Sequence, residues 1–440
     1  MRHLLVLLLP VLAAAPLGAQ DTTTTKDQPI RIGVDYAVNR PGLVVLPGAG
    51  LDSVRSIVRR DLDYTDRFEM VGDFASSGST GSGDPAGPVN YGIYKTMGAQ
   101  LGVELTPAPG GVTARLHDIN GQKVRNTQTF ALPPDGDPEY RMDVHRLSDE
   151  IARWASGTPG MAATRFLFVS GGRVYRIDSD GEQAVPLTPE GMTALSPVWS
   201  PDGRSIAYTR LEGGRGGVIV QPLAGGTSQV APGAQSGLNI TPAFAPDGRT
   251  LAFARSDESG TDIFTANVAD RCCAQRLTVG RYADNLSPTF SPDGRRIAFV
   301  STRSGPPQIY VMAANGTDQE LLAPFDYGAT GASNAPEWSP DGARVVFHRD
   351  VRNVTLAPQI FLVDVAGRRV TQLSSSGRNE DPTWGPDGRH IAFISDRTGR
   401  RQIWIIDTET GRVRQLQTPG AARLPAWSRR LGRATVASNP

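Results

Sequence analysis

The chain has very little cysteine. Only two of its 440 residues are cysteines, Cys272 and Cys273, and because they are adjacent they cannot join distant parts of the chain. In an oxidising compartment they could close a strained vicinal disulfide, and otherwise they are two thiols or a local clip in a surface hairpin. A fold held together by a disulfide framework is therefore excluded.

An excess of charge of one sign is also missing. The 45 Lys and Arg residues balance the 44 Asp and Glu residues to a formal net charge of +1. Domains that bind nucleic acid through its phosphates usually carry a clear basic excess, so a nucleic-acid partner is not expected. After residue 19 no uninterrupted apolar run is long enough for a membrane-spanning helix, so we also expect no direct membrane span.

The residue sets of common catalytic and metal sites are absent as well. The chain lacks Gly-x-Ser-x-Gly, the turn that carries the nucleophile of many hydrolases. None of His117, His145, His348 and His390 has metal-ligand spacing, and each is expected on a strand or helix surface. Asp178-Ser-Asp-Gly181 resembles the start of a calcium loop, but no Glu follows at the twelfth position, which favours a hairpin turn. We therefore predict no catalytic residues, cofactor or metal.

The N-terminus has the pattern of an export signal. Met1–His3 is basic, Leu4–Leu12 is apolar and Ala13–Ala19 is rich in small residues, which together predict a signal peptide over residues 1–19. No cysteine follows the apolar stretch, so lipid attachment there is excluded. Residues 20–29 are polar and repetitive, and we expect them to form a mobile N-terminal segment.

Residues 30–157 alternate between strand and helix patterns and predict a small α/β domain. Two amphipathic helices are predicted, one over residues 51–62 and one over residues 144–154 that is ended by Gly157. A Gly- and Ser-rich stretch, residues 75–88, is expected to be a flexible insertion. Strands are predicted at residues 30–35, 43–46, 68–71, 101–105, 112–118 and 122–132.

One phrase repeats through the rest of the chain: x-Pro-x-aromatic, followed in five of its six copies by Pro-Asp-Gly. Its aromatic residues lie 43 to 48 positions apart: Trp199, Phe244, Phe290, Trp338, Trp384 and Trp427. A period of about 40–50 residues with four short strands per unit indicates a β-propeller. In Pro-Asp-Gly, Pro presets φ, Asp bonds the backbone and Gly accepts a left-handed conformation, as a hairpin requires.

The two ends of this region supply the blade count. Residues 166–188 match the second to fourth strands of a unit, and Leu424–Trp427 matches a first strand with nothing after it. Joined, they make one blade that closes the ring and removes its open sheet edges. We therefore predict a six-bladed β-propeller of Pro-Asp-Gly (WD40-like) repeats over residues 165–431, followed by a basic tail, residues 432–440. The fold class is multidomain, with an α/β domain followed by an all-β propeller.

Taken in this order, the signal peptide, the α/β domain and the blades resemble the TolB family, the periplasmic propeller proteins of the Tol–Pal system. The resemblance includes Asn39–Leu46, Leu147–Ile151 in the helix before the propeller, and the ending Pro425-Ala-Trp-Ser428. Many exported propellers contain Pro-Asp-Gly, so it is the order of the domains that makes the resemblance specific.

The resemblance implies a monomeric, non-catalytic periplasmic adaptor. In the family the propeller face binds Pal, the outer-membrane lipoprotein that grips peptidoglycan, and the N-terminal segment contacts the inner-membrane protein TolA. The system holds the envelope together and helps draw the outer membrane inward at division. The Pal-binding positions that the resemblance implies are Leu238, Asn239, Thr241, Asn285, Leu286, Arg378, Asn379 and Glu380. The implied TolA-binding positions are Ile30, Arg31, Ile32, Val34 and Asp35.

Two of these positions depart from better-known relatives, which carry His where this chain has Leu238 and Thr where it has Leu286. The two leucines are either anchors of a drier interface or caps on the propeller core. Two other functions stay open: the propeller of a prolyl-oligopeptidase-like peptidase whose hydrolase is on another chain, and a small-ligand binder that uses the propeller tunnel.

Overall fold

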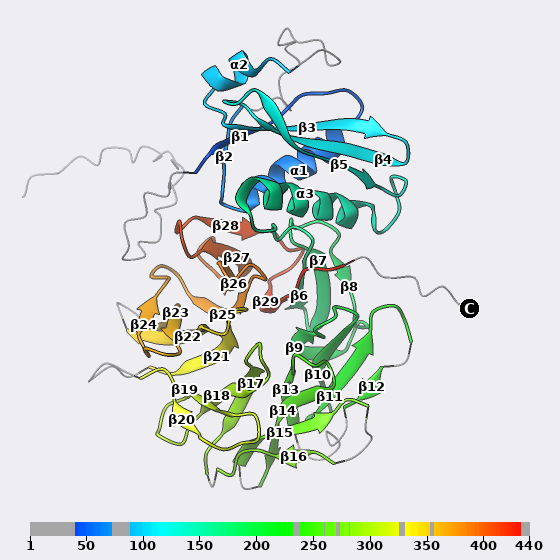
Figure 1. Cartoon of the computed structure of the whole chain (residues 1–440). Helices are drawn as coiled ribbons and strands as arrows, with labels where there is room; N and C mark the ends of the chain where they lie inside the picture. The colour runs from blue at the N-terminus through cyan, green and yellow to red at the C-terminus, as the bar shows by residue number, and fades with distance from the viewer. Residues whose placement is uncertain are drawn as a thin grey trace, which may run out of the picture.

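The computed structural model describes residues 40–72, 89–226, 228–231, 238–258, 260–269, 273–280, 282–324, 331–352 and 356–432. As predicted, these residues form an N-terminal α/β domain and a six-bladed β-propeller (Figure 1). The predicted signal peptide, the segment 20–29, the strand 30–35 and the insertion 75–88 lie outside them. No helix within these ranges has the length and hydropathy of a membrane-spanning segment.

The N-terminal domain is one sheet with two long helices, α1 and α3, and one short helix, α2. The sheet has the strand order β2-β1-β3-β4-β5, in which β1 is parallel to β2 and β3 while β3, β4 and β5 form an antiparallel meander. The strands are β1 (Gly42–Val45), β2 (Glu69–Met70), β3 (Leu101–Ala108), β4 (Gly111–Asp118) and β5 (Lys123–Ala131). The helices are α1 (Asp52–Tyr64), α2 (Tyr91–Thr96) and α3 (Tyr140–Ser156).

The predicted amphipathic stripes explain how α1 and α3 pack. Val54, Val58 and Leu62 of α1 and Leu147 and Ile151 of α3 are buried in one apolar core against the sheet. Helix α3 ends at Gly157, whose φ of 81° is the left-handed conformation that glycine adopts freely. Helix α2 was not predicted, because its six residues are too few to show a helical period.

The propeller consists of six four-stranded sheets, called blades 1 to 6 here. Blades 1 to 3 are β9 (Thr193–Trp199), β10 (Ser205–Glu212), β11 (Arg215–Pro222) and β12 (Gln229–Val230); β13 (Leu238–Phe244), β14 (Thr250–Asp257), β15 (Gly260–Asn267) and β16 (Gln275–Arg276); β17 (Asn285–Phe290), β18 (Arg296–Ser301), β19 (Gln308–Ala313) and β20 (Glu320–Leu321). Blades 4 and 5 are β21 (Ser333–Trp338), β22 (Arg344–Arg352), β23 (Leu356–Asp364) and β24 (Val370–Gln372); β25 (Asn379–Trp384), β26 (His390–Ser395), β27 (Gln402–Asp407) and β28 (Val413–Leu416). Blade 6 joins both ends of the region: β29 (Arg423–Trp427) with β6 (Arg165–Ser170), β7 (Arg173–Asp178) and β8 (Val185–Pro186).

The repeated phrase forms the first strand and first turn of each blade. In blade 1 the turn closes as expected, with Gly203 at a φ of 69° and Asp202 accepting hydrogen bonds from the Ser200 hydroxyl and the Arg204 N–H. The second strands supply the core with a ring of fully buried phenylalanines: Phe168, Phe253, Phe299, Phe347 and Phe393. Apolar packing between neighbouring blades therefore holds the ring together.

The residue before each phrase proline adopts a left-handed backbone. Six non-glycine residues share a φ of 48° to 53° at this position: Ser196, Thr241, Ser287, Ala335, Asp381 and Leu424. The pairing of each first strand with its second strand shifts register at the same place. A bulge repeated in all six blades is thus part of the fold.

Candidate functional site at the two ends of the propeller

The propeller has two ends with different surroundings. The first strands of neighbouring blades lie side by side, so they all begin at the same end of the propeller, which we call the strand-start face. They run to the Pro-Asp-Gly turns at the opposite end, which we call the turn end. The described hydrogen bonds and ion pairs between the domains use turn-end residues of blades 5 and 6, among them Asp180, His390 and Arg412. None of these contacts covers the strand-start face, where the predicted Pal-binding residues lie.

Three of those predicted residues are buried and link neighbouring blades. Asn239, Asn285 and Asn379 occupy the same repeat position, and each is 0% exposed. The Asn285 amide donates to Thr261 O at 3.2 Å and Asp262 Oδ1 at 3.0 Å in blade 2. These side chains therefore hold the ends of the first strands and are not presented on the surface.

The same link is repeated in blade 5 and involves an arginine. Asn379 donates to Gln359 Oε1 of blade 4 at 2.8 Å and accepts from Arg397 at 2.9 Å, just as Asn285 accepts from Arg303 at 3.1 Å. Both guanidinium groups also lie over aromatic rings of their own blades. Each arginine thus connects the polar link to the aromatic core.

The two leucines lie at different repeat positions and in different surroundings. Leu286 is partly buried and packs against the apolar cores on both sides of blade 3. Leu238, also partly buried, lies against Gly216 of β11, next to the start of its own strand. The packing of Leu286 is that of a core cap, whereas Leu238 belongs to none of the apolar clusters formed by the described residues.

Thr241 belongs to a chain of hydrogen bonds between first strands. Its N–H donates to Thr209 Oγ1 at 3.2 Å, and its own Oγ1 accepts from the Ser287 N–H at 3.2 Å. Glu380 forms an ion pair with Arg401 at 3.0 Å. Arg378 is exposed, and of the predicted set it is the clearest surface residue.

The structure adds three apolar residues that the sequence analysis did not name. Val279 and Tyr282, in the loop before β17, are 77% and 97% exposed, and Leu356 at the start of β23 is 47% exposed. They lie on the strand-start face over blades 2 to 4, whereas the exposed Arg378, Arg400 and Arg423 lie over blades 5 and 6. These three residues lie outside the repeated phrase. In the sequence, the only sign of an exposed apolar surface there is that apolar residues stand between polar neighbours.

The five predicted TolA-binding residues, Ile30 to Asp35, lie outside the described part of the chain, and their prediction stands untested.

Titratable groups also occur on the inner strands of blades 4 and 5. Burial raises the pKa of Glu337 to about 7, although its carboxylate accepts from the Trp384 N–H at 3.1 Å. Burial likewise raises the pKa of Asp381 and lowers the pKa of His348 to about 4, where His348 Nδ1 accepts from the Asp381 N–H at 3.1 Å. All three shifts favour the neutral form of the side chain.

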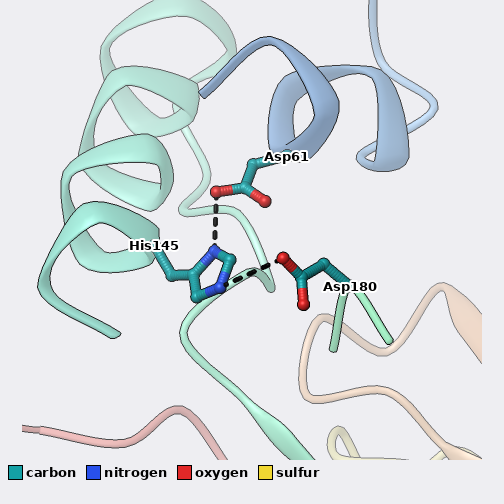
Figure 2. A group of neighbouring side chains, drawn as sticks. All are labelled: Asp61, His145 and Asp180. Carbon is teal, nitrogen blue, oxygen red and sulfur yellow. Dashed lines mark hydrogen bonds and ion pairs between the residues drawn. The ribbon is translucent and has the colours of Figure 1, made fainter. Parts of the chain in front are cut away.

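The turn end contains two buried histidine clusters where the domains meet. His145 of α3 lies between Asp61 of α1, at 2.8 Å, and Asp180 of the β7–β8 turn, at 3.6 Å (Figure 2). His390 of β26 lies between Asp387, at 2.7 Å, and Asp66 just after α1, at 3.2 Å. Both rings are 0% exposed.

The sequence analysis placed the four histidines on surfaces, and this was wrong for at least three of them. His145 and His390 are fully buried between the domains, and His117 is buried in the N-terminal sheet, where it contacts Tyr91 and Glu104. The hairpin turn expected at Asp178–Gly181 is present, but its Asp180 is part of the first cluster. A local turn motif could not reveal that second role.

The donor atoms of each cluster are close enough for an ion. Asp61, His145 and Asp180 place theirs within 4.8 Å of one another, and so do Asp66, His390 and Asp407. However, Arg60 and Arg141 both pair with Asp180, and Arg389 pairs with Asp407. These carboxylates are already neutralised by guanidinium groups, which disfavours a further divalent cation.

The N-terminal domain also has a cavity of about 470 Å³ beside the start of α1. Arg55 and Arg59 line it together with one acidic residue, Asp52, and with Ser56 and residues 45–48. Arg55 pairs with the exposed Asp52 at 2.5 Å, while its Nη1 has no partner among the described residues. The cavity is therefore positively charged and lies far from the strand-start face.

Comparisons with known proteins agree with this architecture. The sequence profile of the TolB beta propeller domain matches residues 155–326 and 326–438. The chain is similar to the Tol-Pal system protein TolB of Methylococcus capsulatus, at 32% identity over 189 residues, which cover 41% of this chain and 44% of that protein. It is also similar to the Tol-Pal system protein TolB of Chromobacterium violaceum, at 30% identity over 239 residues, which cover 51% and 54% of the two chains.

The chain spans about half the length of the curated relatives it matches. The crystal structure of TolB from Acinetobacter baumannii superposes with a TM-score of 0.74 at 24% identity, covering 89% of this chain and 97% of that one. This structural likeness includes both the α/β domain and the six-bladed propeller.

Proposed function

Because the chain belongs to the TolB family of β-propeller proteins, we propose that it is a non-catalytic periplasmic adaptor of the Tol–Pal system. In this proposal the propeller binds Pal and the N-terminal segment, with Ile30 to Asp35, binds TolA. The protein thereby helps maintain outer-membrane integrity and helps draw the outer membrane inward during cell division. Export by the predicted signal peptide would deliver it to the periplasm.

The observation that best supports a partner-binding propeller is the difference between its two ends. The turn end of blades 5 and 6 is occupied by the N-terminal domain, whereas no described contact between the domains reaches the strand-start face. That face presents Val279, Tyr282 and Leu356, apolar side chains that are costly to leave in water. A protein partner that covers them would gain affinity.

Burial in the structure leads us to revise the residues that we propose for the contact with Pal. The buried Asn239, Asn285 and Asn379 support the loops from beneath, so the contact surface we propose consists of Arg378, Leu238 and the exposed apolar residues. Tyr282 is the strongest candidate anchor, because tyrosine combines a large apolar ring with a polar tip.

The test is calorimetric titration of residues 20–440 with the soluble Pal domain encoded in the same genome. We expect saturable one-to-one binding that Tyr282→Ala and Arg378→Glu weaken by about tenfold or more. Ile93→Ala is the matched control, because Ile93 is an exposed apolar residue on α2 of the N-terminal domain. Absence of binding to a folded Pal domain would refute the proposal.

The TolA contact is tested separately by deleting residues 20–34. The shortened protein should melt at the same temperature and bind Pal as before, but it should no longer bind TolA. Undiminished TolA affinity would show that the contact lies elsewhere on the protein.

A further inference from the structure

The two buried histidine clusters share one plan. In each, an imidazole lies between a carboxylate at the end of α1 and a carboxylate of the propeller: Asp61 and Asp180 flank His145, and Asp66 and Asp387 flank His390. His145 comes from the N-terminal domain and His390 from the propeller, so the bridges cross the interface in opposite senses. Figure 2 shows the first bridge, with a carboxylate on each side of the ring.

We propose that these two sites bind protons rather than a metal, and that the resulting imidazolium bridges latch the N-terminal domain onto the propeller. An imidazolium has two N–H donors on opposite sides of the ring, which suits two flanking carboxylates. Both carboxylates hydrogen-bond to His390, whereas His145 hydrogen-bonds to Asp61 and forms a longer ion pair with Asp180 at 3.6 Å. A neutral ring donates only once and would leave one buried carboxylate facing a lone pair. The inference rests on contacts within the chain and does not depend on the proposed partners.

The groups around His145 favour the charged ring. Burial opposes the charge, but the charge and hydrogen bond of Asp61, together with Asp180 and Asp178, raise the pKa of His145 above its ordinary value. The other charged groups nearby are Arg60 and Arg141, which pair with Asp180. Asp149 of the same helix accepts the N–H groups of Ala162 and Ala163, and burial raises its pKa to about 7.

The groups around His390 act in the same direction. Burial again opposes the charge, but Asp387 and Asp66 raise the pKa of His390 to about 9. The carboxylate of Asp407 also lies close to His390 and Asp66. The cations that face it are Arg389, bound to Asp407 and Glu409, and Arg412, bound to Asp63 and Asp66; Arg67 and Arg414 lie just outside them.

The same surroundings disfavour a divalent cation. A metal needs an imidazole lone pair and carboxylate oxygens directed at one point, whereas the two nitrogens of each ring point to carboxylates on opposite sides. Arg60, Arg141 and Arg412 already compensate the carboxylates that an ion would use. Adding two further positive charges would bring repulsion into a dry site.

The latch has a defined pH window. A histidine whose pKa is raised in the folded protein contributes stability that is fully present below the unfolded value of about 6.5. That contribution is lost as pH rises through the folded value, about 9 for His390. The pKa values of Asp387 and Asp407 are lowered, so these carboxylates stay charged well into acid. The domains should therefore uncouple on the alkaline side.

The first test is nitrogen NMR of full-length mature protein carrying ¹⁵N-labelled histidine, with H145Q and H390Q used to assign the signals. Near neutral pH we expect both rings to show two protonated nitrogens, with His390 titrating near pH 9. A neutral ring at either position near pH 7 would overturn the inference for that bridge.

The second test is calorimetric unfolding of the same protein near pH 7 and near pH 10. The wild type should unfold in one transition at neutral pH and in two at alkaline pH, because the domains separate. H145Q/H390Q should show two transitions at both pH values, while H117Q, which alters a buried histidine away from the interface, should behave as the wild type. One transition with the same pH dependence in the double variant would overturn the latch.

The third test separates the proton from a metal. Zinc chloride is titrated into metal-free wild type and into H145Q and H390Q, with binding followed by calorimetry. We expect no stoichiometric binding that either substitution removes. A one-to-one zinc site lost in either variant would overturn the proposal.

Discussion

At the scale of single residues, buried polar side chains carry much of the specificity of the ring. Asn285 and Asn379 link their blades to the preceding blade and accept from Arg303 and Arg397. Apolar packing between blades is non-directional, so it leaves open how one blade sits against the next. Hydrogen bonds with fixed partners remove that freedom.

This role predicts that Asn285→Ala destabilises the protein by about 1–3 kcal/mol, because it leaves the buried Asp262 and Thr261 O with fewer partners. The measurement is the free energy of unfolding in urea. Asn120→Ala is the control, since Asn120 is an exposed turn residue and its loss should change stability by less than about 0.5 kcal/mol. Equal effects of the two substitutions would show that the link contributes nothing.

Glu337 gives a prediction about pH. Burial raises its pKa to about 7, so its contribution to stability is present below the unfolded value of about 4.5 and is lost as pH rises through 7. Glu337→Gln should therefore become more stable than the wild type as pH rises from 5 to 8, by about 1–3 kcal/mol at the upper end. Thermal melts across this range measure the difference. A difference independent of pH would contradict the raised pKa.

Residues at the domain interface mark a limit of sequence analysis. The helical pattern of α3 identifies Leu147 and Ile151 as the stripe that faces the sheet, and both are buried there. His145 lies off that stripe and was therefore expected on the surface, yet it is buried on the propeller side, as is Asp149. Local periodicity reports one packing partner, whereas a helix between two domains has two.

At the scale of elements, the sequence predicted the helix ends, turns and strands that depend on residues close in sequence. It did not predict pairing between segments far apart in the chain. The helix end at Gly157, the turn at Gly203 and the strands of the meander follow from residues close in sequence. The parallel pairing of β1 with β3 joins segments far apart, with 55 residues between Val45 and Leu101, and no pattern encodes it. Similarly, the first-strand bulge is invisible in sequence, because Ser, Thr, Ala, Asp and Leu all occupy it.

The bulge predicts that alanine-to-glycine substitution has different effects on stability inside and outside the bulge. Ala335 has a φ of 50°, a conformation that costs an L-residue about 1–2 kcal/mol but not glycine. Ala335→Gly should therefore be neutral or stabilising by up to about 1 kcal/mol. The matched substitution Ala298→Gly, in the regular and buried strand β18, should destabilise by about 1 kcal/mol. Urea unfolding of both variants decides, and destabilisation of equal size would refute the strained bulge.

At the scale of the whole molecule, blade 6 decides whether the ring stays closed. Strand β29 comes from the end of the described chain and pairs with β6, more than 250 residues earlier in sequence. Every other blade is continuous in sequence, so only here does closure depend on contacts between distant segments. The sequence predicted this composite blade, because its two parts complete one copy of the repeat.

Trp427 is the residue whose loss should open the ring. It is buried, its ring centroid lies 4.5 Å from that of Phe166, and its Nε1 donates to Thr164 Oγ1 at 2.8 Å. Trp338 occupies the same repeat position in blade 4 and is similarly buried, but its indole nitrogen has no partner among the described residues. Comparing substitutions of these two tryptophans therefore distinguishes the loss of core packing from the loss of ring closure.

Trp427→Ala and Trp338→Ala should each cost about 3–5 kcal/mol of stability, because each leaves a large cavity. Only Trp427→Ala should also free the C-terminal strand, since that strand has no covalent connection to the rest of its blade. Limited proteolysis at low denaturant, followed by mass spectrometry, should then remove residues after β28 much faster in W427A than in W338A. Equal cleavage rates at matched stability would mean that pairing between β29 and β6 closes the ring without the tryptophan.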